Sequence, residues 1–291
     1  MRDNLRRIGV AMERIKIYRS IVTLGEIDLL CLDTRTENKP VILCLHGRGG
    51  RAEVWYHFMQ HYGKDYRIIA PDQRGHGLSS KPISYYTSEE MAMDILALIE
   101  HFQLRDIILV GHSMGASIAA ACMDKKPEVF QAVAFLDKTA DGPEQISTLS
   151  LEQLPTEAPM LEGLPVPLSC LQEAMAYIRQ ATDSEFSYQY YLNNLYETVD
   201  GYYFRFSPQA TIANAEYYIG WYDILPKLHC PVLLISAGNF SVIPKADYER
   251  MKALIPDCIA HVMSHPDHNV QLANPEEFYS YFDELLERVQ H

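Results

Sequence analysis

The chain has 291 residues, of which 48% are hydrophobic and 22% charged, so it can bury a sizeable core and is not a disordered protein. Its formal net charge of −13 disfavours nucleic acids and anionic membrane surfaces as partners. These values predict a globular protein with one large domain or two smaller ones.

The sequence also lacks the signals of an exported or membrane-spanning protein. The first residues are basic without the apolar run of a signal peptide, and no stretch approaches the roughly 18–20 apolar residues of a membrane span. The cysteines are far apart, which favours free thiols over disulfides or a zinc site: Cys31, Cys44, Cys122, Cys170, Cys230 and Cys258. We therefore expect a cytoplasmic monomer or homodimer that binds no metal and no organic cofactor.

Short apolar runs alternate along the chain with longer amphipathic ones. A strand pair is predicted at 15–19 and 27–32, with a turn around Gly25. Later runs are apolar at nearly every position, as in strands buried on both faces: 41–45, 67–70, 107–110, 132–136, 232–235 and 259–263. Helices are predicted at 52–62, 88–102, 114–125, 245–254 and 275–289. This alternation predicts a doubly wound α/β sheet.

One segment interrupts the alternation of strands and helices. Residues 139–178 contain no Lys or Arg, and residues 186–222 are rich in aromatic side chains without the alternation of strands. We interpret 138–222 as an inserted helical cap, with the core formed by 1–137 and 223–291. Because a cap over a pocket also lines it, some of its aromatic residues, among them Tyr203 and Trp221, are expected to contact a substrate.

The clearest chemical signal is the sequence Gly-His-Ser-Met-Gly at residues 111–115, which lies between a predicted strand and a predicted helix. G-x-S-x-G in this setting is a nucleophile elbow, a sharp turn that exposes the serine hydroxyl above the sheet. Glycines flank the serine because a Cβ would collide in so tight a turn. Ser113 is therefore the predicted nucleophile.

A nucleophilic serine also needs donors for the oxyanion that forms during acyl transfer. The sequence His-Gly-Arg-Gly-Gly at 46–50 follows the predicted strand 41–45, where the second such donor usually lies. We assign the donors to the backbone N–H groups of Met114 and Arg48. The Arg48 side chain is either a solvated or structural arginine or a contact for a substrate carboxylate.

Together these segments resemble the α/β-hydrolase fold family with a helical cap, over nearly the whole chain. The other matching segments are Asp-Gln-Arg-Gly-His-Gly at 72–77, the strand at 230–235 and residues 268–278. The resemblance implies a mostly parallel eight-stranded sheet flanked by helices. It also implies that His268 is the catalytic base, ahead of His265, because the family's histidine precedes an Asn-Pro helix start at this spacing. The 72–77 loop is structural in the family.

The acid of the triad does not follow the usual pattern of the family. The position after the seventh strand reads Ala-Gly-Asn-Phe-Ser-Val-Ile-Pro at 237–244, and no Asp or Glu lies between Asp223 and Asp247. Either the acid lies elsewhere, or Asn239 is a weaker partner, or the enzyme is impaired. Haloalkane dehalogenases and acetamidomethylene-succinate hydrolases have the acid after the sixth strand, the position of Asp137 here. Since losing the acid lowers kcat by ~10⁴, a relocated acid is favoured.

The chain resembles the acetamidomethylene-succinate hydrolases in two further segments, 72–82 and 199–201 with the following Arg205. Arg205 either pairs with a neighbouring acidic residue of the cap or holds a substrate carboxylate. The expected reaction is hydrolysis of a carboxylic ester of a small, largely apolar substrate through an acyl-enzyme on Ser113. The alternatives are hydrolysis of an amide, thioester or C–C bond of a small carboxylate-bearing metabolite, or a catalytically reduced binding protein.

Overall fold

A computed structural model of the protein describes residues 14–154 and 166–290. The prediction that the chain has no signal peptide falls mostly on residues 1–13, which lie outside the described residues. Part of the predicted cap, 155–165, also lies outside them. In the two described ranges, no helix is both long enough and apolar enough to cross a membrane.

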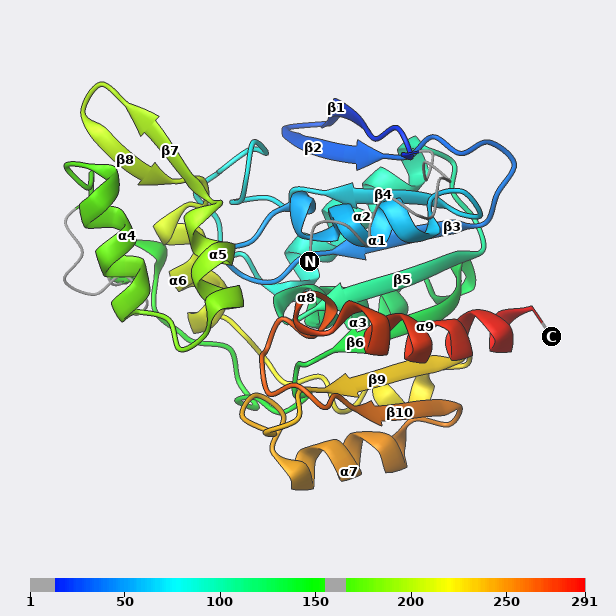
Figure 1. The fold of residues 1–291 in the computed structure, drawn as a ribbon. Coiled ribbons are helices and arrows are strands. Elements are labelled where there is room, and N and C mark those ends of the chain that lie inside the picture. Colours follow the sequence, from blue (N-terminus) through cyan, green and yellow to red (C-terminus); the bar gives the residue numbers. More distant parts are fainter. Residues whose placement is uncertain (1–13, 155–165, 291) are drawn as a thin grey trace, which may run out of the picture.

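Eight strands form one sheet in the order β1-β2-β4-β3-β5-β6-β9-β10 (Figure 1). β2 runs antiparallel to β1 and to β4, and all other pairings in this sheet are parallel. The strands are β1 Tyr18–Leu24, β2 Ile27–Asp33, β3 Val41–Leu45, β4 Arg67–Pro71, β5 Ile107–His112, β6 Phe130–Leu136, β9 Val232–Ser236 and β10 Cys258–Val262. The predicted mostly parallel eight-stranded sheet is confirmed.

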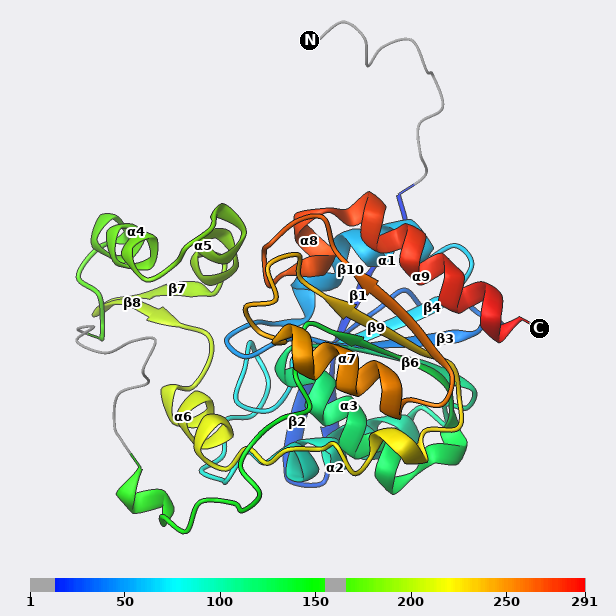
Figure 2. The same cartoon turned by 90° about the horizontal axis from the view of Figure 1, so that it is seen from below.

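Helices cover both faces of this sheet (Figure 2). The helices outside the predicted cap are α1 Tyr56–Tyr62, α2 Ser88–His101, α3 Met114–Lys125, α7 Lys245–Leu254, α8 Val270–Ala273 and α9 Pro275–Val289. Along β5, Ile107 and Leu109 pack into the apolar layer with α2, α3 and α7, whereas Ile108 and Val110 pack into the layer with α1 and α9. Because successive side chains of a strand point to opposite faces, this apolar run fills two cores.

The first strand differs from its prediction. It spans Tyr18–Leu24 rather than 15–19, and Leu24 pairs directly with Ile27. Gly25, with a φ of 64°, and Glu26 form a two-residue turn between them. A turn this short fixes the register, so the strand continues to the turn itself.

The segment predicted as a helical cap contains helices and a two-stranded antiparallel sheet. Its elements are α4 Leu171–Gln180, α5 Glu185–Leu192, β7 Leu195–Thr198, β8 Gly201–Phe204 and α6 Pro208–Glu216. The all-helical prediction is wrong at this hairpin, since Gly201 turns the chain with a φ of 131° and the flanking tyrosines favour strands. These elements lie at the end of the main sheet to which its parallel strands point (Figure 1).

Candidate active site

Ser113 is the single residue between β5 and α3. Its φ of 53° and ψ of −119° lie in a region that a residue with a side chain adopts only at a cost of about 1–3 kcal/mol. Two glycines make the turn possible, because a Cβ on Gly115 would lie 2.5 Å from the carbonyl oxygen of Leu45 and a Cβ on Gly111 would collide with the backbone of Gly115. The strained turn presents the serine hydroxyl at the end of the sheet.

His268 lies between β10 and α8, and its ring joins two polar side chains. Its Nε2 is 2.8 Å from Oγ of Ser113, and its Nδ1 is 2.7 Å from Oδ2 of Asp137. Asp137 follows β6, is fully buried, and accepts a second hydrogen bond of 2.9 Å from the backbone N–H of Ala237. A carboxylate fixed in this way keeps the imidazole proton on Nδ1 and leaves Nε2 to accept a proton from serine.

Asn239 and His265, the alternatives considered above, and Asp223, the acidic residue that precedes the strand β9, lie in different surroundings. The side-chain oxygen of Asn239 accepts a hydrogen bond of 3.0 Å from the backbone N–H of Ser241, within its own turn. Asp223 is exposed and forms an ion pair of 3.4 Å with Lys227. His265 accepts a hydrogen bond of 3.1 Å from a backbone N–H two residues further on. The structure therefore brings Asp137, and not these candidates, to His268.

His112, the residue before the serine, contacts His268 and helps to fix its position. Its Nε2 donates a hydrogen bond of 2.8 Å to the backbone carbonyl of His268, and the two ring centroids are 4.7 Å apart. Burial, together with the neighbouring His268, lowers the pKa of His112 well below its usual value, so its ring stays neutral. Sequence reasoning missed this contact, because the second position of G-x-S-x-G carries no fixed residue type.

The carbonyl group of Gly47 accepts three hydrogen bonds. The donors are Nδ1 of His46 at 2.8 Å, the backbone N–H of Gly50 at 3.1 Å, and the hydroxyl of Tyr190 in α5 at 3.0 Å. This carbonyl belongs to the same peptide unit as the N–H of Arg48. Three donors on the oxygen fix the plane of that peptide and polarise its N–H group.

The backbone N–H groups of Met114 and Arg48, both beside Ser113, have no acceptor among residues 14–154 and 166–290. Met114 is the first residue of α3, so its N–H is one of the free donors at the positive end of that helix. Burial lowers the pKa of His46 to about 4, and the backbone N–H of Gln73 donates to its Nε2 at 3.0 Å. This neutral histidine holds the loop that carries Arg48.

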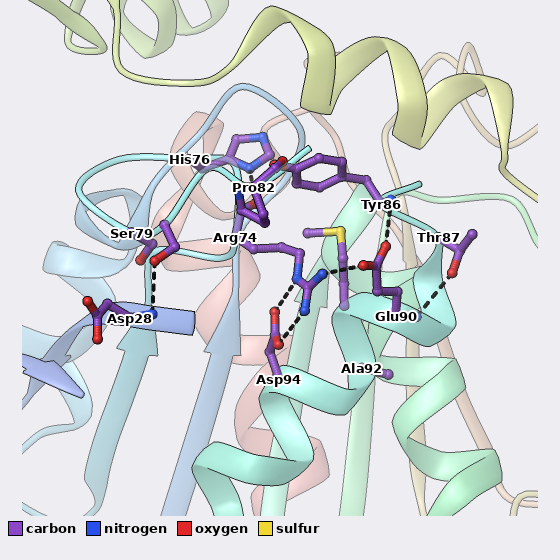
Figure 3. Close-up of polar contacts among 12 residues, drawn as sticks. Asp28, Arg74, His76, Ser79, Pro82, Tyr86, Thr87, Glu90, Ala92 and Asp94 are labelled. Carbon is purple, nitrogen blue, oxygen red and sulfur yellow. Dashed lines mark hydrogen bonds and ion pairs between the residues drawn. The ribbon is translucent and has the colours of Figure 1, made fainter. Parts of the chain in front are cut away.

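The loop 72–77 is fixed by contacts within the protein. Asp72 accepts hydrogen bonds of 2.7 and 2.9 Å from two backbone N–H groups. The Arg74 guanidinium bonds both carboxylate oxygens of Asp94, at 2.5 and 2.6 Å, while a third nitrogen reaches Glu90 (Figure 3). These contacts agree with the structural role that the family resemblance implies for this loop.

A cavity of about 110 Å³ opens beside Ser113. Its lining includes Arg48, Ser117, Lys138, Asn214 and Tyr218. Aromatic rings of the predicted cap pack on one another, as Phe204 and Phe206 do at 4.9 Å between centroids. Polar and cationic side chains are left to line the space at the serine.

Lys138 is the main feature of this cavity that sequence reasoning missed. Burial and, to a smaller extent, the charge of Arg48 lower the pKa of Lys138 to about 8. Its ammonium group lies 4.0 Å from the ring centroid of Tyr218. The available signal was its position, directly after Asp137 at the carboxyl end of β6.

A separate groove of about 370 Å³ lies beside His268. His268 lines this groove, together with Ser184 and Tyr191 of the predicted cap and Asn239 of the core. The hydroxyl of Ser184 also donates a hydrogen bond to Asp267, the residue before the histidine. The predicted cap and the histidine loop are therefore in direct contact at this groove.

Three residues predicted to contact substrate lie away from the serine cavity. Tyr203 pairs with Tyr196 across the β7–β8 hairpin, with ring centroids 5.8 Å apart, and the Arg205 guanidinium lies 5.4 Å from the centroid of the Tyr196 ring. Trp221 is buried against Phe135, at 5.0 Å between centroids. Cross-strand pairing and core packing thus account for these side chains, and the structure does not bring them to Ser113.

Comparison with known proteins gives consistent matches over most of the chain. The family model described as the alpha/beta hydrolase fold matches residues 40–275. The 2-(acetamidomethylene)succinate hydrolase of Mesorhizobium japonicum is 28% identical over 257 residues, which cover 86% of this chain and 90% of that protein. The uncharacterized hydrolase YugF of Bacillus subtilis is 24% identical over 279 residues, covering 91% and 96%.

A similar result comes from solved structures. The crystal structure of E-2-(acetamidomethylene)succinate hydrolase superposes with a TM-score of 0.77 at 24% sequence identity, covering 94% of this chain and 100% of that chain. Likeness at this level of identity shows that the two chains share a fold.

Proposed function

The chain belongs to the α/β-hydrolase fold family, and we propose that it is a serine hydrolase that cleaves a carboxylic ester of a small substrate through an acyl-enzyme on Ser113. The observation that carries this proposal is the hydrogen-bonded line from Asp137 through His268 to Ser113, with distances of 2.7 and 2.8 Å. Nucleophile, base and orienting acid are the three groups that acyl transfer to water requires.

In the proposed mechanism, His268 Nε2 takes the proton of the Ser113 hydroxyl while its oxygen attacks the carbonyl carbon of the ester. The N–H groups of Met114 and Arg48 stabilise the negative charge that develops on the carbonyl oxygen. His268 then protonates the leaving alcohol, and Asp137 stabilises the imidazolium between these steps. Water, activated by the same histidine, releases the acid from the serine.

Amide hydrolysis is the second candidate. A relative of this chain is named as the hydrolase of 2-(acetamidomethylene)succinate, a compound with an amide bond. The same triad and oxyanion donors can hydrolyse esters, amides and thioesters. The triad alone therefore does not determine which of these bonds is cleaved. A catalytically reduced binding protein is disfavoured, because that alternative depended on a missing acid and Asp137 lies 2.7 Å from His268.

A fluorophosphonate probe tests the proposed nucleophile. We expect prompt labelling at Ser113, measured by peptide mass spectrometry, and loss of labelling in His268→Ala. His261→Ala is the matched control, because His261 pairs with Glu284 at the surface and should leave labelling unchanged. Labelling that is absent in the wild type, or equally fast in His268→Ala, would contradict the proposal.

The bond type is tested with an ester, a thioester and an anilide of the same short acyl group. The proposal predicts that the ester has the highest kcat/KM of the three. A higher kcat/KM for the anilide would instead support amide hydrolysis by the same residues.

A further inference from the structure

The cavity beside Ser113 contains two cationic side chains, Arg48 and Lys138. We propose that these two cations bind a carboxylate at the far end of the substrate's acyl group, so that the enzyme acts on esters of short dicarboxylic acids. This inference rests on the proposed acyl-enzyme at Ser113 and adds the class of acyl group that the serine accepts.

Neither cation has an acidic partner within residues 14–154 and 166–290. Other arginines do, such as Arg67 with Asp33 at 2.7 Å and Arg74 with Asp94 at 2.5 Å. Two like charges that share a small, partly desolvated space repel each other, and burial penalises each of them. An anion between them would relieve both costs.

The neutral side chains of the cavity have already committed their donors. The hydroxyl of Ser117 donates to the carbonyl of Met114 at 2.9 Å. The amide nitrogen of Asn214 donates to the carbonyl of Tyr86 at 3.0 Å and also contacts a methionine sulfur. Arg48 and Lys138 are therefore the side chains of this cavity with charged N–H donors left for a ligand, and such donors bind carboxylates strongly.

Tyr218 fixes the position of the lysine. Its hydroxyl lies 3.1 Å from the carbonyl oxygens of Thr139 and Asp141 and also 3.1 Å from Nε1 of Trp221. The ring held in this way lies under the Lys138 ammonium group at 4.0 Å. The ammonium is thus positioned beside the serine by a rigid aromatic contact rather than by an ion pair.

The position of the cavity assigns it to the acyl side of the substrate. Arg48 and Met114, whose N–H groups are the proposed oxyanion donors, line this cavity, whereas His268 lines the separate groove of about 370 Å³. The leaving alcohol must lie near His268, which protonates it. The acyl chain therefore extends in the other direction, toward Arg48 and Lys138.

The size of the cavity limits the acyl chain. Its volume of about 110 Å³ is well below the roughly 300–1,000 Å³ of cavities that hold drug-sized ligands. Such a space suits one or two methylene groups followed by a carboxylate, as in malonyl or succinyl esters.

The direct test compares mono-p-nitrophenyl succinate with p-nitrophenyl 4-methylpentanoate, a neutral ester of nearly the same shape. Because hydrogen bonds to charged groups contribute more than neutral ones, we expect the wild-type kcat/KM to favour the succinate by at least ~10-fold. An equal or higher kcat/KM for the neutral ester would overturn the inference and leave the proposed function standing. No hydrolysis of either ester together with no probe labelling of Ser113 would instead contradict the proposed function.

Variants locate the preference within the cavity. In Lys138→Met and Arg48→Met, the ratio of the two kcat/KM values should fall toward one, and Lys138→Arg should retain most of it. Lys252→Met, at an exposed lysine of α7, is the control and should keep the wild-type ratio. A ratio unchanged in both methionine variants would overturn the assignment.

A second measurement avoids turnover altogether. Free succinate should slow fluorophosphonate labelling of wild-type Ser113 more strongly than free 4-methylpentanoate at the same concentration. Equal protection by the two acids would count against a carboxylate site at Arg48 and Lys138.

Discussion

Two arginines follow neighbouring parallel strands, and their surroundings differ. Arg74, after β4, is held in a fork by Asp94 and Glu90 (Figure 3). Arg48, after β3, has no acidic partner among the described residues and lines the cavity at Ser113. A paired charge stabilises a loop, whereas an unpaired charge beside a nucleophile is available to a substrate. The 72–77 loop, whose arginine is paired, is therefore structural, whereas the loop of Arg48 has a charge available to a ligand.

The largest expected effect is at the triad, which lies beside the unpaired Arg48. His268→Ala should lower kcat by about 10⁶-fold, because without a base the serine keeps its proton. The unfolding temperature should stay close to that of the wild type, since the side chain is half-buried in the site rather than in a core. Steady-state kinetics with a p-nitrophenyl ester and a thermal scan measure both quantities.

Asp137→Asn should lower kcat by about two to four orders of magnitude, because the amide no longer stabilises the imidazolium and favours the wrong tautomer. Asp223→Asn is the matched control, since that carboxylate is exposed and pairs with Lys227. A severe loss in the control, with near wild-type turnover in Asp137→Asn, would show that the acid has been assigned to the wrong residue.

The paired arginine should matter for stability. Arg74→Met leaves Asp94 and Glu90 without their partner, and breaking such a buried pair costs about 3–5 kcal/mol of the free energy of unfolding. Arg48→Met should change that free energy by less than about 1 kcal/mol, because it leaves no acidic group unpaired. Urea unfolding curves of the two variants make the comparison, and equal losses of stability would remove the distinction drawn above.

Tyr190 connects the predicted cap to the loop of Arg48 through the carbonyl of Gly47. Tyr190→Phe should lower kcat about five- to tenfold with little change in KM, since the lost hydrogen bond supports an N–H that acts on the transition state. Tyr196→Phe in the exposed hairpin should leave both constants near wild type. A rise in KM with unchanged kcat would assign Tyr190 to substrate binding instead.

The smallest expected effect is a pH dependence of substrate preference. The lowered pKa of Lys138, about 8, means that its ammonium is charged below this pH and neutral above it. The groups facing it are Arg48, which stays charged, and the neutral Tyr218. The kcat/KM ratio of the anionic over the neutral ester should therefore fall several-fold above pH 8 and then level off. A ratio independent of pH between 7 and 9.5 would contradict this role.

Much of the core could be predicted from local sequence. Met114–Lys125, Lys245–Leu254 and Pro275–Val289 begin and end where the sequence predicts. Pro at the start of α9, with the Asn274 side chain accepting a hydrogen bond from a backbone N–H of its first turn, is the kind of signal that acts over a few residues. Continuous apolar runs identified the buried strands for the same reason.

The site could be predicted only in part, because several of its contacts join distant segments. The elbow at Ser113 has a local signature, and the sequence left Asp137 and Asn239 as competing partners of His268 until distances were known. Tyr190 and Gly47 are 143 positions apart, and no periodicity relates them. The sequence did not single out Lys138 for a similar reason, since its surroundings depend on Tyr218, which is far away along the chain.

The acyl-enzyme itself is the most direct test of the account. Wild-type protein mixed with mono-p-nitrophenyl succinate, quenched in acid within the first turnover and digested, should yield the peptide containing Ser113 with the mass of one added succinyl group. Ser113→Ala should yield no such adduct. Release of p-nitrophenol in the wild type without any adduct on this peptide, or with the adduct on another residue, would contradict the assignment of Ser113 as the nucleophile.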